Sequence, residues 1–498
     1  MGAPASASLR LAASRAHRFS SRHASPTRVP VIVLVADGAR PDALDDSALV
    51  GLPSLQRLHE EGALYSVASV FPSVTGPAYT PFLMGRFPGP IGIPGLRWFD
   101  RSRTAGKWPD YARSYVGHQM RRFDEDLDPT APTIFELVPE SLAALSVVTR
   151  GLAPERRIGA LTPRSALRAA VTHFRGRAER WLDVDQEIGD EVVRRMRDER
   201  PDFLFAAFTG VDKASHARGH DDALVHEALA IVDDVAGRLR EQAERGGWWG
   251  ETHLWLVSDH GHSPVHTHED LAAVVAETGR RTVAHPWSAG IAPDAAVMVS
   301  GNAMAHVYVE LEQRERAWWP ALAARHEGLA AELSARESVD LLMLPHGPER
   351  CEVRSATRGT AFVERCGDRY RYARQSGDPL VLGADVDGDV EAVFDATLES
   401  TYPDGIVQIV TLAGSARAGD LIVSSTPGWD FRARYEPIPH RSAHGALHRD
   451  HVMVPLLTNR PAEGTPRRTT DIFASALDAL SVAAPDRMDG RSFLRGGD

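Results

Sequence analysis

The sequence contains only two cysteines among its 498 residues, Cys351 and Cys366. A protein held together by disulfides needs more than these, and a chain of this length can bury a core large enough to fold without them. Neither cysteine lies beside a histidine, so a zinc motif built on cysteines is excluded as well. We predict that both thiols pack in the interior rather than form a disulfide.

Long apolar runs and an excess of positive charge are also missing. No run approaches the roughly 20 apolar residues of a transmembrane helix, so we predict no membrane span. The chain has 56 Lys and Arg residues against 67 Asp and Glu, a formal net charge of −11. Binding a nucleic-acid duplex requires a basic surface, so we do not expect such a partner. Because negative charge repels anionic substrates too, a site for them would need local cations.

Acidic residues are absent before Asp37, and Arg, Ser and Ala are frequent there. The segment lacks the apolar core of about 7–15 residues that a secretory signal contains. We predict a disordered basic tail over residues 1–29, with an organellar transit peptide as the alternative. A cytoplasmic location is therefore the expectation.

Short apolar runs alternate with segments of helical periodicity along most of the chain. This pattern is typical of an α/β fold, with a mostly parallel central sheet and helices on both faces. Residues 222–245 carry apolar side chains at i, i+3, i+4 and i+7, which predicts a helix that ends at Gly246-Gly247. The apolar runs are residues 31–36, 203–209, 253–257, 421–424 and 452–457.

The texture changes between residues 345 and 419, where short polar segments alternate in charge. We interpret this stretch as a small inserted α+β cap. The predicted organisation is the tail at 1–29, a catalytic α/β domain in two parts at 30–344 and 420–498, and the inserted cap subdomain at 345–419.

Three of the apolar runs each lead to an aspartate, namely Asp37, Asp212 and Asp259. Ligand sites of open α/β sheets lie at the carboxyl ends of the strands, so we expect these acids to meet in one crevice. Three carboxylates gathered there require positive charge nearby.

Histidines accompany these acids. His260 follows Asp259 directly, His216 comes one helical turn after Asp212, and His444 lies near the C-terminus. Taken singly, such an aspartate is more often a helix N-cap and such a histidine a core or surface residue. Together they favour a metal site, and mixed Asp and His ligation suits zinc, with manganese or iron as alternatives.

A candidate nucleophile, Thr75, precedes Gly76 and Pro77. Proline favours the first position of a helix, so we predict that Thr75 lies at a helix N-terminus, where unpaired N–H groups attract phosphate. Ser73 and Thr80 remain alternatives for this role, and Thr75 could also be an ordinary N-cap.

The order of these motifs resembles the alkaline phosphatase superfamily, and within it the type I phosphodiesterase and nucleotide pyrophosphatase family. The resemblance implies an alkaline-phosphatase-like fold and a metal-dependent hydrolase of phosphate esters, most nearly a phosphodiesterase, with a phosphothreonine intermediate. The motifs that carry it are ADGARPD at 36–42, FPSVTGPAYTPFLMGRFPG at 71–89, VDKASHARG at 211–219, VSDHGH at 257–262 and SAHG at 442–445.

The resemblance also implies two divalent metal ions, with Zn²⁺ as first choice. One would be held by Asp37, Thr75, Asp259 and His260. The other would be held by Asp212, His216 and His444. All of these positions carry a competent ligand.

The sequence departs from the family pattern at two places. Ala78 stands where nucleotide pyrophosphatases commonly have an asparagine that binds the phosphoryl oxygen, so another donor is needed. Lys213 and Asn302 are the candidates for binding substrate, although each could be an ordinary solvated or turn residue. His262 stands where an apolar residue such as Met is usual, and we expect it to belong to a solvated histidine-rich loop, with an outer-shell role or a third metal as alternatives.

The expected partner is a small phosphorylated substrate, such as a nucleotide or nucleotide sugar. A phosphomonoesterase, a phosphonate hydrolase and a non-catalytic relative that binds phosphate ligands remain alternatives, and the mutase branch of the superfamily ranks below them. The sequence does not predict the oligomeric state.

Overall fold

The computed structural model describes residues 30–45, 47–103, 112–160, 171–172, 175–285, 292–432 and 439–496. The predicted tail at 1–29 lies outside the described residues. In the part of the chain that the structure describes, no helix combines the length and apolar character needed to cross a membrane. The cytoplasmic location stays a prediction.

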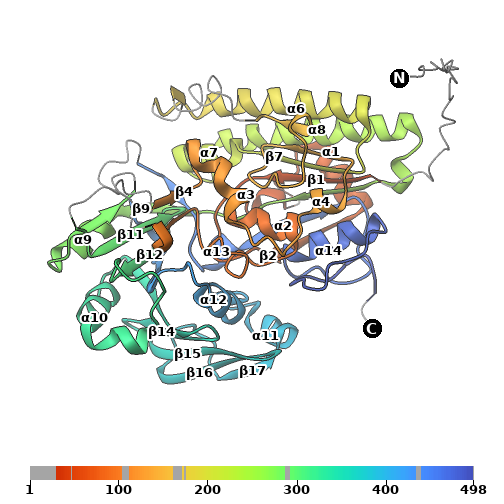
Figure 1. Ribbon diagram of the computed structural model, residues 1–498. Helices are drawn as coiled ribbons and strands as arrows, with labels where there is room; N and C mark the ends of the chain where they lie inside the picture. Colours follow the sequence, from red (N-terminus) through yellow and green to blue (C-terminus); the bar gives the residue numbers. More distant parts are fainter. Residues whose placement is uncertain are drawn as a thin grey trace, which may run out of the picture.

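A seven-stranded sheet forms the centre of the upper part of the molecule as it is drawn in Figure 1, beneath α6 (Glu179–Glu199) and α8 (Ala223–Gly246). Strands β1, β5, β6, β7 and β8 are parallel, while β21 is antiparallel to both of its neighbours, β8 and β2. The predicted mostly parallel α/β sheet is confirmed. In spatial order the strands are β2 (Ala63–Ala68), β21 (Met453–Thr458), β8 (His253–Val257), β1 (Val31–Ala36), β7 (Phe203–Phe208), β5 (Ser141–Ala144) and β6 (Arg157–Ile158).

Helices cover both faces of this sheet (Figure 1). Alternate side chains of β1 point to opposite sides, so both faces carry apolar side chains that have to be buried. Ile32 and Leu34 join one hydrophobic cluster, and Val33 and Val35 join the other. The first cluster is closed by α1 (Pro53–Glu61), α6 (Glu179–Glu199) and α8 (Ala223–Gly246), and the second by α2 (Thr80–Met84), α4 (Ile134–Leu137) and α14 (Thr470–Ala479).

Helix α8 confirms the helix expected over residues 222–245. The carboxylate of Asp222 accepts the N–H of Leu224 at 2.9 Å, which caps the first turn. At the other end Gly247 adopts a left-handed conformation, with φ of 72°.

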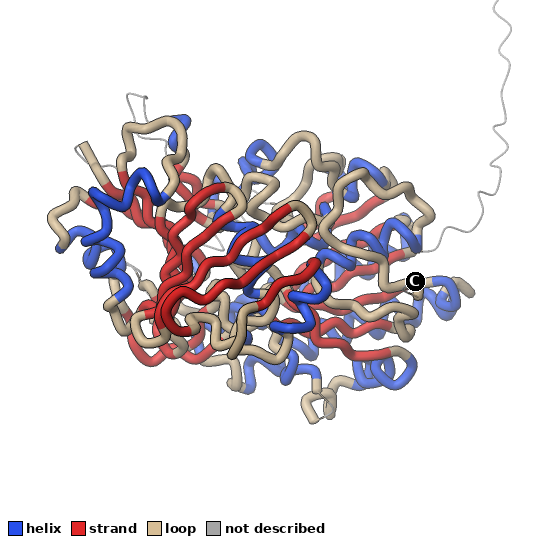
Figure 2. Tube along the Cα trace, turned by 90° about the horizontal axis from the view of Figure 1, so that it is seen from below, coloured by secondary structure: helices blue, strands red, loops and turns tan. Residues whose placement is uncertain are grey.

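A second sheet of nine strands lies beside the first (Figure 1), and Figure 2 shows it from below as a broad curved layer. All its strand pairs are antiparallel except β10 with β11. In spatial order the strands are β10 (Thr282–Ala284), β11 (Ala295–Ser300), β12 (Met304–Val309), β18 (Leu421–Ser425), β13 (Val339–Gly347), β14 (Arg350–Ser355), β15 (Gly359–Cys366), β16 (Arg369–Gly377) and β17 (Val386–Asp389).

Helix α10 (Trp319–Ser334) contributes to the hydrophobic cluster on one face of this sheet, and α12 (Gly405–Ala413) to the cluster on the other. The stretch 345–419, predicted as an inserted cap, supplies β14 to β17, α11 (Val390–Thr397) and α12, and β13 runs across the predicted boundary at 345. The division of the chain into domains remains a prediction. The apolar run at 421–424 forms β18 in this antiparallel sheet rather than a strand of the parallel one.

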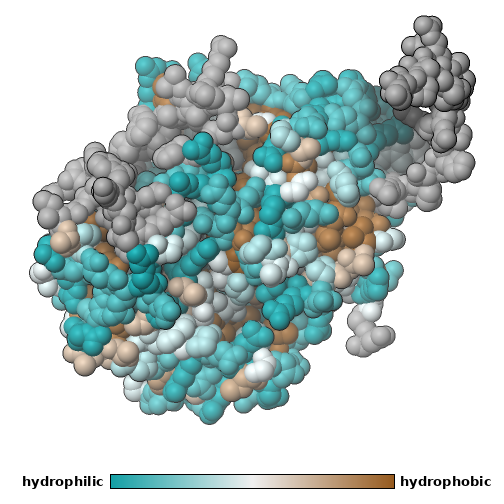
Figure 3. Space-filling model, viewed as in Figure 1, coloured by the Kyte–Doolittle hydropathy of each residue, from teal (hydrophilic) through white to brown (hydrophobic). Residues whose placement is uncertain are grey.

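Smaller elements connect the two sheets. A three-stranded sheet joins β19 (Gly428–Asp430), β9 (Ser263–His268) and β20 (Ser442–Ala443), and β3 (Arg97–Phe99) pairs with β4 (Ala112–Ser114). Hydrophilic residues predominate on the face shown in Figure 3. Further α-helices among the described residues are α3 (Phe123–Asp126), α7 (Gly210–Arg218), α9 (Leu271–Glu277) and α13 (Arg449–Val452).

Both cysteines are free thiols. Cys351 on β14 is buried, as predicted, whereas Cys366 at the end of β15 is exposed, so the packing prediction is wrong for Cys366.

Candidate active site

The structure brings the three predicted aspartates together at one edge of the parallel sheet. Asp37 follows β1 directly, Asp259 comes two residues after β8, and Asp212 lies in the first turn of α7, just beyond β7. Because β1 pairs in parallel with both β7 and β8, the carboxyl ends of these strands are adjacent. All three carboxylates are buried.

Asp37, Thr75, Asp259 and His260 form the first of two groups. The Thr75 Oγ1 atom lies 3.2 Å from Asp37 Oδ1 and 3.1 Å from His260 Nε2. The same Nε2 atom is 3.3 Å from Asp37 Oδ1 and 3.6 Å from Asp259 Oδ2. The Thr75 hydroxyl therefore contacts the Asp37 carboxylate and the His260 imidazole. The carboxylate of Asp259 lies near the same imidazole.

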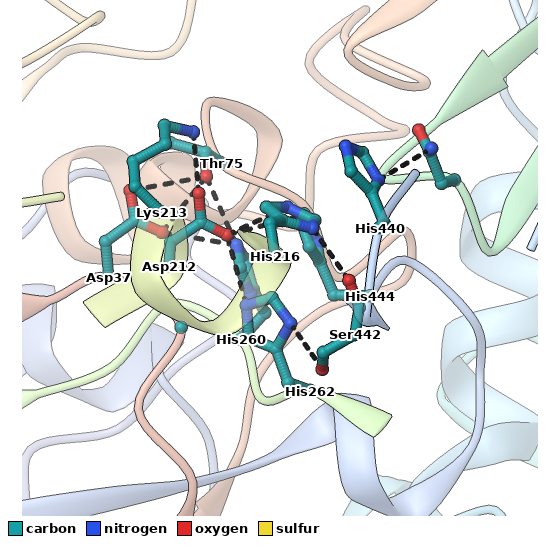
Figure 4. A network of polar contacts seen from close by, with 12 residues as sticks. Asp37, Thr75, Asp212, Lys213, His216, His260, His262, His440, Ser442 and His444 are labelled. Carbon is teal, nitrogen blue, oxygen red and sulfur yellow. Dashed lines mark hydrogen bonds and ion pairs between the residues drawn. The ribbon is translucent and has the colours of Figure 1, made fainter. Parts of the chain in front are cut away.

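The second group centres on Oδ1 of Asp212 (Figure 4). His216, one helical turn along α7, places its Nε2 atom 3.1 Å from this oxygen, and His444 approaches to 3.6 Å. His262, which was not among the expected ligands, lies at 3.1 Å.

The hydrogen bonds of the expected histidines fix the position of their ring protons. The Nδ1 atom lies 2.8 Å from Ser442 O in His216, 2.9 Å from Ser73 O in His444 and 3.2 Å from Gly261 O in His260. A backbone carbonyl can only accept, so each Nδ1 donates, and in the neutral ring Nε2 is left with a lone pair. Histidine ligands of metal ions are held in this way.

Buried negative charge dominates the electrostatics. Burial raises the pKa of Asp259 to about 8, and the charge of Asp37 adds to this shift. Burial disfavours charge on His260, but Asp259 and Asp37 outweigh it and raise the His260 pKa to about 9. Burial alone would raise the Asp212 pKa as well, but His216 and Lys213 hold it well below its usual value. Protons or cations have to supply the compensating charge.

The side chains of the site fit divalent cations. The Oδ2 atom of Asp259 is buried and has no hydrogen-bond partner among the described residues, a costly state for a carboxylate oxygen that binds nothing. The described side chains include three groups whose ligand atoms lie within 4.8 Å of one another, namely Asp37–Asp259–His260, Asp212–His260–His444 and Asp212–His216–His262.

Among the three hydroxyls considered as nucleophile, Thr75 is the one that faces the acids. Ser73 Oγ donates to Ala446 O at 3.0 Å, and Thr80 Oγ1 donates to Pro77 O at 2.8 Å, so both hydroxyls are bonded to the backbone. The helical turn η2 (Pro77–Tyr79) begins at the proline, as expected, but its N-cap is Gly76, with φ of 96°. The prediction that Thr75 lies at the helix terminus is therefore off by one residue, because the chain turns at Gly76.

The two predicted substrate-binding residues differ in their surroundings. Lys213 Nζ lies 2.7 Å from Asp212 Oδ2, and its side chain is 34% exposed. Burial lowers the pKa of this amine, but Asp212 and Asp37 outweigh burial and raise it. Asn302 is buried, and its Nδ2 atom lies 2.9 Å from His440 Nδ1, on the far side of His216.

The expectation of a solvated loop is wrong for His262. Its side chain is fully buried, and burial lowers its pKa to about 3. Strand β9 begins at the next residue and pairs with β20, which draws His262 inward. His266 and His268 are exposed, and His268 bonds to Asp430 at 2.6 Å. The signal in the sequence was the histidine itself, at a position where an apolar residue is usual.

Comparison with solved structures shows the fold at low sequence identity. Phosphonoacetate hydrolase from Sinorhizobium meliloti 1021, in complex with phosphonoformate, is 16% identical with a TM-score of 0.54, over 92% of this chain and 96% of that one. Murine ectonucleotide pyrophosphatase/phosphodiesterase 5 is 13% identical with a TM-score of 0.53, over 93% and 97% of the two chains. The human protein of that name is 13% identical with a TM-score of 0.54, over the same shares.

No curated protein is significantly similar in sequence. The family model for type I phosphodiesterase/nucleotide pyrophosphatase, however, matches residues 31–448, which contain every acid and histidine of both groups. The chain therefore belongs to the type I phosphodiesterase/nucleotide pyrophosphatase family.

Proposed function

We propose that this protein is a metal-dependent phosphoester hydrolase with Thr75 as its nucleophile. The observation that carries the proposal is the position of the Thr75 hydroxyl, 3.2 Å from Asp37 Oδ1 and 3.1 Å from His260 Nε2. A hydroxyl that lies between a carboxylate and an imidazole can lose its proton and attack an electrophile.

In this proposal one divalent cation is held by Asp37, Thr75, Asp259 and His260. The second is held by Asp212, His216 and His444. When bound, such cations lower the pKa of the hydroxyl and neutralise charge on a phosphoryl group. Zinc is the first choice for this mixed set of carboxylates and imidazoles, with manganese or iron as alternatives.

The residues then divide the reaction into two displacements. The Thr75 hydroxyl loses its proton and its oxygen attacks phosphorus. The bond to the leaving group breaks, which produces a phosphothreonine and a leaving group that takes up a proton. Water then attacks the same phosphorus from the side opposite the Thr75 oxygen. The bond to Thr75 breaks, and a proton from the water returns to the Thr75 oxygen. Asp37 and His260 keep the threonine oxygen oriented in both steps.

Lys213 is the proposed donor to the phosphoryl oxygen, since Ala78 has no donor to offer. Its ammonium group lies beside Asp212 and is in part exposed, so it can reach a substrate. Lys107 is the only other lysine in the sequence, and all remaining basic residues among the 56 Lys and Arg are arginines. A lysine at this position is therefore a marked exception to the composition of the chain. Asn302 is the weaker candidate, because its amide already contacts His440.

For the substrate we propose phosphodiesters or pyrophosphates, including nucleotides and nucleotide sugars, in line with the family. An inactive threonine-to-alanine variant of the murine structural relative was solved in complex with AMP. A phosphonate hydrolase is the second candidate, because Lys213 offers a cation beside the acids that would suit a substrate with an additional negative group.

The test is a substrate panel on the purified full chain, combined with metal analysis. We expect about two metal equivalents and faster hydrolysis of bis-p-nitrophenyl phosphate than of p-nitrophenyl phosphate or phosphonoacetate. A faster rate on one of the latter two would reassign the reaction. Metal-loaded protein that turns over none of the three would favour a binding-only relative.

A further inference from the structure

His262 is a buried side chain at the centre of the site for which the seven expected ligands leave no role. It lies between β8 and β9, with none of its side chain exposed. Its Nε2 atom is 3.1 Å from Asp212 Oδ1, the same separation as that of His216 from this oxygen.

The proton of His262 is located by a chain of hydrogen bonds. Ser442 Oγ lies 2.9 Å from the carbonyl oxygen of Ser263, which can only accept. A hydroxyl has one proton, so in the tautomer that keeps this bond Ser442 accepts from His262 Nδ1, at 3.2 Å. In that neutral tautomer, Nε2 of His262 is unprotonated and directs its lone pair at the carboxylate of Asp212.

Such a contact is repulsive unless positive charge lies between the two atoms. A lone pair and a carboxylate oxygen at 3.1 Å cannot hydrogen-bond to each other, whereas both can bind the same cation. His216 and His444 face the same oxygen with their own Nε2 atoms, after donating Nδ1 protons to backbone carbonyls.

The three imidazoles lie close to this oxygen and to one another (Figure 4). Their ring centroids are 4.9 Å apart for His216 and His262, 5.1 Å for His216 and His444, and 5.1 Å for His262 and His444. The ligand atoms of Asp212, His216 and His262 lie within 4.8 Å of one another, and His444 Nε2 lies 3.6 Å from the same Asp212 oxygen. Imidazole and carboxylate donors of this kind suit a zinc-like cation.

The backbone leaves room for the additional ring at Gly38. A Cβ atom at this position would lie 2.7 Å from His262 Nε2 and 3.2 Å from the Cα atom of Asp212. The glycine that follows Asp37 therefore allows His262 to approach Asp212.

We propose that His262 is a fourth protein ligand of the second cation, together with Asp212, His216 and His444. The inference rests on the proposed function in that a cation binds there. A ligand set of three imidazoles and one carboxylate favours zinc or cobalt over harder ions, whereas the first group is richer in oxygen and tolerates manganese better. The second cation is thus the more strongly held of the two.

Metal binding, measured separately from turnover, tests this assignment. Apo-protein is titrated with Zn²⁺ against a chromophoric chelator, and the Co²⁺-loaded protein is examined by visible absorption. The variants are His262→Met, the apolar side chain usual at this position, and His262→Gln, whose amide can donate a hydrogen bond to Asp212 instead of sharing a cation with it. His266→Ala, on the exposed face of β9, is the matched control.

We expect the wild type and His266→Ala to bind two equivalents with the same affinities. Both His262 variants should lose at least about tenfold in affinity for one equivalent and change the Co²⁺ spectrum. Wild-type affinity and spectrum in both variants would overturn the assignment, and so would rescue by glutamine, because that would mean His262 only positions Asp212. A wild-type chain that binds no cation would instead overturn the proposed function.

Discussion

The two sheets differ in where their strands end, and this difference decides where charge gathers. In the seven-stranded sheet, β1, β7 and β8 run in parallel, so their carboxyl ends are neighbours and deliver Asp37, Asp212 and Asp259 to one place. In the nine-stranded sheet nearly all neighbours are antiparallel, so like ends alternate between its two edges. From the second sheet Asn302, between β11 and β12, reaches the site through a backbone bridge to His444.

Buried charges are also compensated differently in the two sheets. At the second sheet buried acids are paired with arginines. Asp340 Oδ1 on β13 lies 2.7 Å from Arg358 Nη2, and Oδ2 of Asp420, which precedes β18, lies 2.5 Å from Arg101 Nη2. In the first sheet Asp37 and Asp259 have no arginine partner among the described residues, and their closest charged neighbour there is the His260 imidazole, with Nε2 at 3.3 Å and 3.6 Å. Changes at the site should therefore affect turnover more than stability, and changes in the second sheet should do the reverse.

Removal of the Thr75 hydroxyl should have the largest effect. Thr75→Ala is expected to lower kcat by at least about 10³-fold, because no other hydroxyl takes its place, whereas Thr75→Ser should retain part of the activity. The melting temperature should stay close to that of the wild type, since this side chain supports no part of the core. Steady-state rates and thermal unfolding on the same preparations test both statements. Unchanged hydrolysis by Thr75→Ala would remove the nucleophile assignment.

The converse change lies in the second sheet, at Asp420. Asp420→Ala leaves the Arg101 guanidinium buried without this carboxylate, and it should lower the free energy of unfolding by about 3–5 kcal/mol. Turnover per folded molecule should be unaffected, because the hydrogen bonds of Asp420 go to Arg101 and Val309, neither of which belongs to the site. Denaturant unfolding provides the measurement, and Asp385→Ala, which removes an exposed partner of Arg374 in the same sheet, is the control with a much smaller expected loss. Equal losses in the two variants would contradict the contrast between the sheets.

The part of the fold that could be predicted from the sequence is the part with strong local signals. β1, β7 and β8 are continuous apolar runs, as strands buried on both faces require, and α8 has a capping aspartate, a regular apolar stripe and a terminal glycine. An apolar run does not encode the direction of its partner, however. For this reason the apolar run at 452–457 does not indicate that β21 is antiparallel to β8, and the run at 421–424 does not indicate that β18 belongs to the antiparallel sheet.

The candidate site was predictable to the same extent. The expected ligands follow predicted strands or belong to recognisable motifs, and the structure brings them together. The position of His262 depends on contacts with Ser442, which is 180 residues away in the sequence, and on the pairing of β9 with β20. No local pattern carries that information, so the polar segment after Gly261 looked like a solvated loop.

A smaller effect on the second sheet should appear as a dependence of stability on pH. His306 on β12 is fully buried, accepts the Gly419 N–H at Nδ1 and donates from Nε2 to Pro94 O, with the Arg316 charge nearby. Burial first, and Arg316 in addition, lower its pKa from 6.5 to about 4.

Between those pKa values the unfolded chain binds a proton at His306 that the folded chain does not. This residue's contribution to stability should thus be complete above about pH 6.5 and fall by roughly 3 kcal/mol as the pH drops toward 4. His306→Gln should remove that part of the pH dependence and leave kcat at neutral pH unchanged. Denaturant unfolding at several pH values gives the comparison, and parallel curves for wild type and variant would refute it.

The smallest predicted effect is at Lys213. Variants of this residue can distinguish an ammonium that binds the substrate from one that only holds Asp212 in place. Lys213→Met should lower kcat/KM by about 10- to 100-fold, mostly through kcat, if the ammonium binds the phosphoryl oxygen in the transition state. Lys213→Arg keeps the positive charge at this position, so it should recover part of the rate that the methionine variant loses. The contact of Nζ with Asp212 Oδ2 at 2.7 Å allows the other role, in which lysine only holds the carboxylate in place. In that event the methionine variant would lose metal affinity along with rate, so a normal metal content with reduced kcat identifies Lys213 as a group that acts on the substrate.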